Sequence, residues 1–221
     1  MAREIIDLHT HSIISDGALI MAELVRHAVV SGYGVIGVTD HVDSALLEGT
    51  AATIMDFARK SQKYFPDIVI IPGAELTHVP PDEIASLVRE ARAMKLPLVV
   101  VHGETRAEPV AEGTNRAAIE AGVDILAHPG LISEDDVRRA AEKGVHLELT
   151  YKKGHSITNG HVAACARKYG AKLVIDSDCH RPGEFLTERA RMDVGLGAGL
   201  SDEEFMRAVD NSERLAKRLL Q

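Results

Sequence analysis

Histidines and carboxylates recur along this chain directly after short apolar runs. The first run leads into DLHTHSIISDG at residues 7–17, which holds His9 and His11 two positions apart. Because side chains at i and i+2 of a strand point to the same face, these two imidazoles are expected to face one side together. Six of seven such runs end in residues of this kind: His9, His11, His41, Glu75, His102, His128, Asp178 and His180. The repeated position predicts one shared metal site.

The donor types indicate which ions such a site would take. Imidazole and carboxylate groups without cysteine suit Zn, Mn or Fe. A single zinc ion needs only three or four protein ligands, and this chain offers more. The surplus predicts two or three divalent ions bridged by carboxylates, with Glu75 and Asp178 as the bridges. Asp16 in SDG is a ninth candidate, although this tripeptide is also typical of a turn.

Two more aspartates share strand faces with these candidates. Asp7 is expected to point with the first histidine pair, and Asp176 with the last ligand pair. Each either accepts a hydrogen bond that fixes an imidazole or is a polar residue of the interior, and the sequence leaves both open. Cys179 lies inside the last ligand pair and is expected to point away from the site.

The apolar runs that precede these residues are expected to be buried parallel strands, since they are almost continuously apolar. They cover residues 4–10, 34–41, 68–76, 96–103, 123–130, 145–151 and 172–180. Amphipathic patterns predict helices between them at 19–32, 80–95, 133–144, 159–170 and 201–220, and residues 104–117 are the most loop-like. The alternation predicts one α/β domain over residues 1–221, as a barrel or an open sheet. A barrel gathers the strand ends on one face, where only the run 145–151 brings no ligand.

Composition limits the classes of function. The chain has 221 residues and a net charge of −8, which argues against a broad grip on nucleic acid. Cys165 and Cys179 are too few for a disulfide framework, and we expect reduced thiols in a cytoplasmic protein. No apolar run approaches the roughly 20 residues that span a bilayer, so no membrane contact is expected.

The ordered motifs resemble the PHP (polymerase and histidinol phosphatase) family of metallohydrolases. The matching pieces follow the family's order from residue 7 to residue 180. They are HTH at 9–11, SDG at 15–17, TDH at 39–41, GAE at 73–75, VHGE at 101–104, AHPG at 127–130 and DSDCH at 176–180. The resemblance implies a distorted (β/α)7 TIM-like barrel with a trinuclear metal site.

The resemblance also implies how the ligands are shared. One ion would take His9, His11, Glu75 and Asp178. A second would take Glu75, His102 and His128, and the third Asp16, His41 and His180. Asp40 in TDH is expected to support the ligands from behind, and it joins Asp178 and Arg181 in the predicted catalytic group.

This site suits phosphoester hydrolysis. Three divalent ions with three carboxylates leave a formal charge of about +3, which attracts an anion. The ions would generate hydroxide near neutral pH and stabilise a phosphoryl group in displacement. We therefore expect a phosphatase acting on a small phosphomonoester, similar to histidinol phosphate. Arg181, Lys152, Lys153 and His155 are the predicted substrate contacts, whereas His27, His78, His146 and His161 are expected to be ordinary histidines.

Three other functions remain open at this stage. A nuclease or phosphodiesterase of the same family would use the same ions on a short nucleic-acid substrate. A metal-dependent amidohydrolase also uses a barrel with an HxH strand, but usually has eight strands and often a modified lysine. A non-enzymatic RNA-binding protein, similar to the barrel subunit of ribonuclease P, would be expected to lose the ligands and to be basic.

Overall fold

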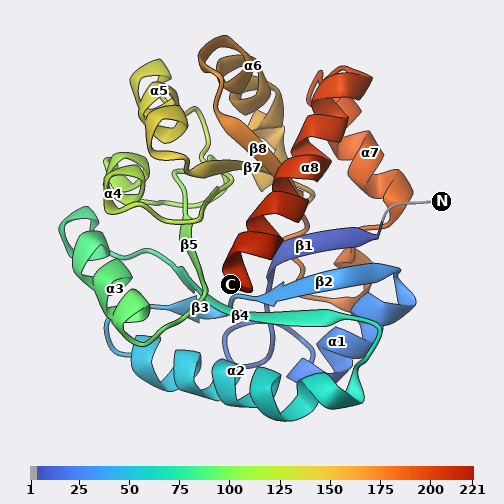
Figure 1. Ribbon diagram of the computed structural model, residues 1–221. Coiled ribbons are helices and arrows are strands. Elements are labelled where there is room, and N and C mark those ends of the chain that lie inside the picture. Colours follow the sequence, from blue (N-terminus) through green and yellow to red (C-terminus); the bar gives the residue numbers. More distant parts are fainter. Residues whose placement is uncertain (1–3) are drawn as a thin grey trace.

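Seven parallel strands follow one another around a nearly closed barrel in the computed structural model, which describes residues 4–221 (Figure 1). Their residues are largely apolar and buried, as expected of strands covered on both faces. The strands are β1 (Ile5–Thr10), β2 (Tyr33–Val38), β4 (Val69–Leu76), β5 (Leu98–His102), β6 (Ile125–Ala127), β7 (His146–Thr150) and β8 (Lys172–Asp176). The predicted distorted (β/α)7 barrel is thereby confirmed.

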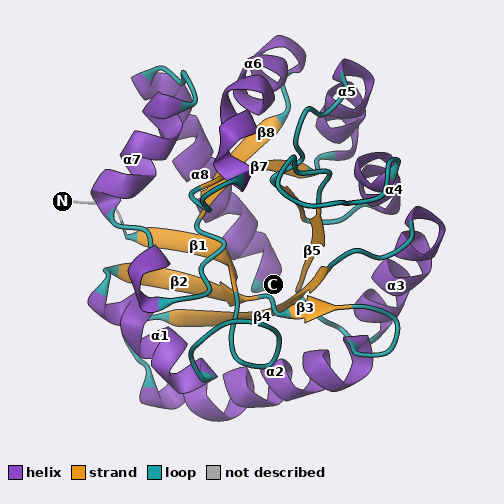
Figure 2. Ribbon diagram, turned by 180° about the vertical axis from the view of Figure 1, so that it is seen from behind, coloured by secondary structure: helices purple, strands orange, loops and turns teal. Residues whose placement is uncertain are grey.

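Helices surround this barrel, as Figure 2 shows from the opposite side. They are α1 (Met21–Val30), α2 (Leu47–Ser61), α3 (Pro81–Ala93), α4 (Thr114–Ala121), α5 (Glu134–Lys143), α6 (Asn159–Tyr169), α7 (Glu188–Gly197) and α8 (Asp202–Leu219), with short 3-10 helices η1 (Gln62–Tyr64), η2 (His155–Thr158) and η3 (Pro182–Glu184). A capping box of Ser201 and Glu204 starts α8. No helix within residues 4–221 is long and apolar enough to cross a membrane.

The first and last strands of the barrel meet through a seam between β1 and β8. The backbone N–H of His11 donates to the Cys179 carbonyl at 2.9 Å, and that of Asp178 donates to the His9 carbonyl at 3.0 Å. Lower in the seam, the Leu8 N–H donates to the Asp176 carboxylate at 2.7 Å. The seam therefore joins the two segments that carry the first and last predicted ligands.

The C-terminal helix α8 covers the opposite end of the barrel, where its last turns lie over the strand starts (Figure 1). Leu215 and Ala216 pack with Leu8 and Val174 in the barrel interior. The Asn211 amide also donates to the Leu173 carbonyl at 2.9 Å. These contacts leave the C-terminal ends of the strands as the open face of the barrel.

Some elements differ from the sequence predictions. The second predicted strand breaks after Val38, and His41 lies in the separate two-residue strand β3 (His41–Val42), which pairs with β4. At this break the side chains of Thr39 and Asp40 accept hydrogen bonds from the Thr10 and Ser12 N–H groups. The Asp40 carbonyl accepts from the Glu75 N–H of β4, where pairing of β3 with β4 begins. The predicted loop at 104–117 ends earlier, since α4 begins at Thr114. Helices α2, α4 and α7 were missing from the prediction.

A buried polar cluster ties the closed end of the barrel together. The Asp124 carboxylate accepts hydrogen bonds from the Val99 N–H at 2.8 Å, from Arg92 of α3 at 2.6 Å and from Arg218 of α8 at 2.7 Å. His146 lies beside it at the start of β7, with Nδ1 3.1 Å from the Asp124 carbonyl. Burial lowers the pKa of His146 to about 4. His146 therefore lies at the end of the barrel opposite the predicted ligands.

The depressed pKa of His146 predicts a loss of stability in acid. The unfolded chain, with the ordinary value of 6.5, binds this proton more readily than the folded chain does. Stability should therefore fall as the pH drops from about 6.5 towards 4. Between pH 7 and pH 5, wild type should lose about 2 kcal/mol more than His146→Gln, as urea unfolding at both values would measure. His27→Gln, on the exposed face of α1, should behave as wild type; an equal loss in His146→Gln would refute the assignment.

Candidate metal centre

All nine predicted ligands lie at the open end of the barrel. His9, Glu75 and His102 stand in the last residues of β1, β4 and β5, and His41 begins the short strand β3. The others lie beyond strand ends or in the adjoining loops. Six of the nine are buried: His9, His11, Glu75, His102, His128 and Asp178. His41 and His180 are partly exposed, and the Asp16 side chain is 60% exposed. The fold therefore brings the whole predicted set to one place.

Two buried carboxylates form the centre of the set. Glu75 Oε1 lies 3.2 Å from His9 Nε2, and Glu75 Oε2 lies 3.4 Å from His41 Nε2. Asp178 Oδ1 lies 3.3 Å from His11 Nε2, and its Oδ2 lies 3.6 Å from His128 Nε2. Each carboxylate thus faces imidazoles from different strands, as a bridging ligand would.

The charges of this cluster perturb its members in opposite directions. Burial raises the pKa of Glu75, but the nearby imidazoles of His9 and His41 outweigh it and hold that pKa well below the usual range. Burial lowers the pKa of His9, but the carboxylates of Glu75, Glu148 and Asp178 outweigh this effect. The pKa of His9 therefore lies well above its ordinary value. Burial lowers the pKa of His11 to about 4, so this ring is neutral at pH 7. A neutral imidazole has a lone pair for a metal.

Several donor atoms of the cluster are buried without a hydrogen-bond partner among residues 4–221. They are Nε2 of His9, Nε2 of His41, Oε1 of Glu75 and both ring nitrogens of His11 and of His128. Buried polar atoms are nearly always paired, so this concentration calls for an explanation. Two ligand atoms bound to one ion at about 2.1 Å lie roughly 3.0–3.5 Å apart. The separations of 3.2 Å between Glu75 and His9, 3.4 Å between Glu75 and His41, and 3.3 Å between Asp178 and His11 match that value. These residues fit divalent metal ions.

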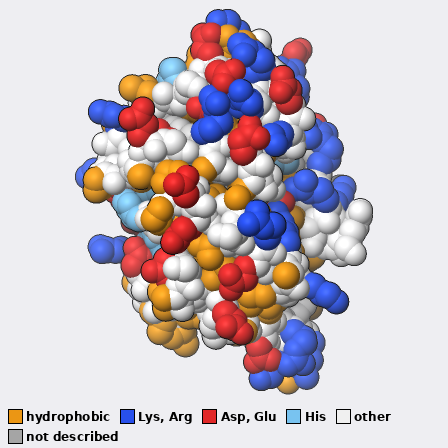
Figure 3. All heavy atoms as spheres, turned by 90° about the vertical axis from the view of Figure 1, so that its left-hand side faces the viewer, with side chains coloured by type: hydrophobic (Ala, Val, Ile, Leu, Met, Phe, Trp, Pro, Cys, Tyr) orange, Lys and Arg blue, Asp and Glu red, His pale blue; other side chains and the backbone are white. Residues whose placement is uncertain are grey.

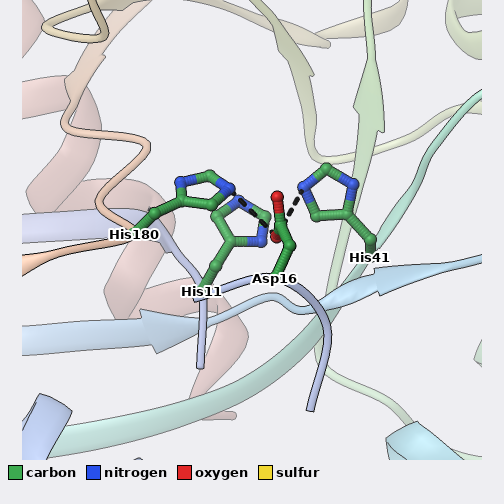
Figure 4. A group of neighbouring side chains, drawn as sticks. All are labelled: His11, Asp16, His41 and His180. Atoms are coloured by element: carbon green, nitrogen blue, oxygen red, sulfur yellow. Dashed lines mark ion pairs between the residues drawn. The ribbon is translucent and has the colours of Figure 1, made fainter. Parts of the chain in front are cut away.

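One group of four lies nearest the solvent. Figure 4 shows the Asp16 carboxylate between His41 and His180, with the His11 ring behind it. Asp16 Oδ1 lies 3.1 Å from His180 Nε2 and 3.6 Å from His41 Nε2. The hydrogen bond from His180 lowers the pKa of Asp16, so this carboxylate is ionised. The turn residue of SDG therefore faces the two histidines with which it was predicted to bind an ion.

The remaining ligands gather into overlapping groups. One joins His9, His11 and Asp178, and another joins His9, Glu75 and His128. A further group contains His102 and His128 with His155, which the sequence predicts as a substrate contact. His155 is 6% exposed, and its ring centroid lies 4.3 Å from that of His128. His155 thus lies among the imidazoles rather than at the edge of the pocket.

Glu148 is a part of the site that the sequence prediction missed. It is fully buried in β7, and its Oε2 lies 3.0 Å from His9 Nδ1. A carboxylate in this position fixes the ring so that Nε2 faces the metal cluster. The signal was available, because Glu148 is the single carboxylate in the apolar run VHLELTY. The strand that was expected to bring no ligand instead supports one.

Asp7 and Asp176, whose roles the sequence leaves open, belong to the β1–β8 seam. Asp7 accepts hydrogen bonds from the Tyr33 hydroxyl at 2.8 Å and from the Ser177 N–H at 3.1 Å. Asp176 accepts from the Leu8 N–H. These contacts favour the interior role over the fixing of an imidazole. Cys179 is buried in the apolar cluster with Tyr33 and points away from the ligands, as predicted.

Asp40 supports the loop that carries Asp16. Its carboxylate accepts hydrogen bonds from the Ser12 N–H at 2.8 Å and from the Ser15 hydroxyl at 2.7 Å. Asp40 is fully buried, whereas Asp16 lies on the exposed side of the same loop. Its contacts place Asp40 behind the ligands, where the sequence prediction put it.

A pocket of about 250 Å³ opens over the metal ligands. Lys152 lines it, with Nζ 2.7 Å from His180 Nδ1 and 3.1 Å from Glu184 Oε2. Arg181 and His155 also line the pocket. Lys153 is exposed and is not among the lining residues, so the structure does not bring it to the other predicted substrate contacts.

Two acidic residues of the pocket wall were also not predicted. Glu184 holds Lys152, and it lies in η3 directly after the last ligand segment. Glu108 lies in the loop after β5 and approaches His78 and His102. Neither stands at a strand end, so the rule that located the metal ligands could not find them.

Known proteins share both the sequence and the fold. Residues 7–177 match the PHP domain family. The uncharacterized protein MJ1295 of Methanocaldococcus jannaschii is 43% identical over 199 residues, which cover 90% of this chain and 91% of that protein. The chain therefore belongs to the PHP domain family, and the resemblance predicted from its motifs is confirmed.

Solved structures with this fold are more distant in sequence. One is histidinol phosphate phosphatase from Lactococcus lactis, complexed with zinc, L-histidinol and phosphate (TM-score 0.58, 14% identity, 95% of this chain and 93% of that one). Another is described as YwqE from Bacillus subtilis and CpsB from Streptococcus pneumoniae, metal-dependent tyrosine phosphatases (TM-score 0.60, 19% identity, 97% of this chain and 95% of that one). A Xaa-Pro dipeptidase also matches (TM-score 0.64, 13% identity, 98% of this chain and 75% of that one). At these identities the likeness establishes the fold alone.

Removing the Glu148 carboxylate should weaken metal binding. Glu148→Ala frees the His9 ring to rotate, and affinity for Mn²⁺ should fall between about 10- and 100-fold. Glu148→Gln keeps an acceptor for the Nδ1 proton of His9 and should lose less Mn²⁺ affinity than Glu148→Ala. Calorimetric titration of chelator-treated protein measures both effects. Glu142→Ala, an exposed carboxylate of α5, is the control, and wild-type affinity in Glu148→Ala would contradict the supporting role.

Proposed function

We propose that the protein is a metal-dependent phosphoesterase that hydrolyses a small phosphomonoester. The observation that carries this proposal is the nine-residue donor set beneath a pocket lined by Lys152 and Arg181. Membership of the PHP domain family supports it. Proteins of similar fold, the histidinol phosphate phosphatase and the tyrosine phosphatases YwqE and CpsB, are named for phosphate monoester chemistry.

The ligand groups are proposed to hold three divalent ions. The first belongs to His9, His11, Glu75 and Asp178, the second to Glu75, His102 and His128, and the third to Asp16, His41 and His180. Bound there, the ions supply water of lowered pKa and neutralise negative charge on a phosphoryl group. Zn, Mn and Fe all suit these donors. Glu75 and Asp178 keep the cluster together because each faces more than one imidazole.

The chain's own residues then bind the substrate. Lys152 and Arg181 are cationic and line the pocket, so we assign them to the phosphoryl oxygens, with His155 beside them. Glu184 positions Lys152 through their 3.1 Å contact. Asp40 holds the loop of Asp16 and does not reach the substrate itself. Asp178 serves the reaction as a ligand at the centre of the cluster.

The size of the pocket and the charge of the chain favour a small substrate over nucleic acid. The pocket volume of about 250 Å³ accommodates a phosphate with a compact alcohol. The chain carries a net charge of −8. Figure 3 shows basic and acidic side chains interspersed over the drawn face, without a continuous basic groove there. Nucleic-acid binding depends on such a basic surface.

Metal content and activity together test this function. Wild type should bind two to three ions per chain, measured by elemental analysis, and should hydrolyse a phosphomonoester panel faster than a diester. His9→Ala and Glu75→Gln should each lower kcat/KM by on the order of 10²-fold or more, since each removes part of the metal site. His27→Ala should retain full activity. A metal-free protein, or one that hydrolyses only amides, would refute the proposal.

The role of Lys152 has a separate test. Lys152→Ala removes a charged donor to the phosphoryl group and should raise KM about tenfold, with a smaller change in kcat. Metal content should stay at the wild-type value, which separates substrate binding from support of His180. Lys172→Ala, at the start of β8 and thus at the other end of the barrel, is the matched control. An unchanged KM in Lys152→Ala would remove this residue from the substrate site.

A further inference from the structure

The loop between β5 and α4 reaches over one side of the metal cluster. Its base is fixed, since Glu104 Oε1 accepts hydrogen bonds from the Gly113 and Asn115 N–H groups at 3.0 and 2.8 Å. Gly130 packs so closely on the Glu104 carbonyl that a Cβ at this position would clash with it. Farther along, the Ala107 methyl group lies 3.5 Å from where a Cβ would stand on Gly154. The loop thus extends from β5 to the turn after β7.

Glu108 lies on this loop, and its carboxylate meets three imidazoles. Oε2 lies 3.0 Å from His78 Nε2 and 3.3 Å from His102 Nε2. Oε1 lies 3.4 Å from His155 Nε2. The hydrogen bond with His102 lowers the pKa of Glu108 to about 2, so it is a carboxylate at neutral pH. Its side chain remains 39% exposed, in contrast with the buried Glu75.

The atoms that Glu108 faces are those that a metal ion would use. His102 Nδ1 lies 3.2 Å from the Gly103 carbonyl, which leaves Nε2 as the ligand atom. The neighbouring His128 has both ring nitrogens buried without a partner in the described part of the chain, and His155 has such an Nδ1. The separation of 3.3 Å between Glu108 Oε2 and His102 Nε2 is that of two ligands on one ion.

We propose that Glu108 is a displaceable ligand of the metal ion at His102, and that a phosphoryl oxygen replaces it when substrate binds. The inference rests on the proposed phosphoesterase function. The half-exposed carboxylate borders both the catalytic pocket and the adjoining pocket of this loop, which also contains Arg106 and Glu112. It can therefore leave the ion without unfolding the loop base, which Glu104 holds independently.

Displacement has a measurable signature, because metal and phosphate affinities should change in opposite directions. Glu108→Gln loses a metal ligand, so one Mn²⁺ should bind about tenfold more weakly. With the metal sites saturated, Glu108→Gln should bind inorganic phosphate about tenfold more tightly than wild type. This value assumes that Glu108 occupies its ligand position on the metal about nine-tenths of the time in wild type. Calorimetry with Mn²⁺, and then with phosphate on the Mn²⁺-loaded protein, measures both affinities.

Two further variants separate the loss of a metal ligand from the loss of a negative charge. Glu112→Gln removes the same charge from the same loop and should leave both affinities at wild-type values. Glu108→Asp keeps the charge but shortens the side chain, and it should behave as Glu108→Gln. Equal tightening of phosphate binding in Glu112→Gln, or an unchanged metal or phosphate affinity in Glu108→Gln, would overturn the proposal.

The two proposals fail differently. A wild-type protein that binds neither Mn²⁺ nor phosphate would overturn both. A wild-type protein that binds metal and hydrolyses phosphomonoesters, with Glu108→Gln indistinguishable from it, would overturn only the role of Glu108.

Discussion

The structure depends on keeping two ionised carboxylates, Glu75 and Asp178, inside the barrel. Removing a carboxylate from water is costly unless opposite charge or hydrogen-bond donors replace the lost solvent. Imidazoles from several strands lie around these two groups, and their attraction outweighs the burial that would otherwise raise the carboxylate pKa values. The histidines and carboxylates are thus interdependent, and divalent ions would supply positive charge at their common centre.

Backbone geometry is adapted to the same centre. His128 and Asp178 both have positive φ angles, of 26° and 54°, a conformation that costs a non-glycine residue about 1–3 kcal/mol. His128 directly follows β6, and Asp178 lies two residues after the end of β8. Both side chains belong to the metal-ligand cluster, where they face each other. Regular strand geometry would send alternate side chains to opposite faces. The left-handed residues allow ligands to be placed where an extended strand could not put them.

Much of the site could be predicted because the barrel imposes a simple rule. Residues at the ends of parallel strands converge, so His9, Glu75 and His102 could be grouped from the sequence alone. Glu148 does not follow that rule, since it acts from within a strand. Glu108 lies in a loop whose path depends on packing against Gly130 and Gly154, and sequence periodicity carries no information about such contacts. The break before His41 is accompanied by hydrogen bonds to the Asp40 side chain, which are equally specific to the folded state.

The β1–β8 seam has a consequence for how the protein is made. The hydrogen bond from Leu8 to Asp176 joins residues separated by 168 positions. Contacts of such long range form late, because loop-closure entropy opposes them until intervening structure has condensed. During synthesis the first histidine pair emerges from the ribosome long before its partner segment exists. Strand β1 must then remain without β8 until residues 172–176 have been synthesised, so early capture of a metal by β1 alone would compete with correct assembly.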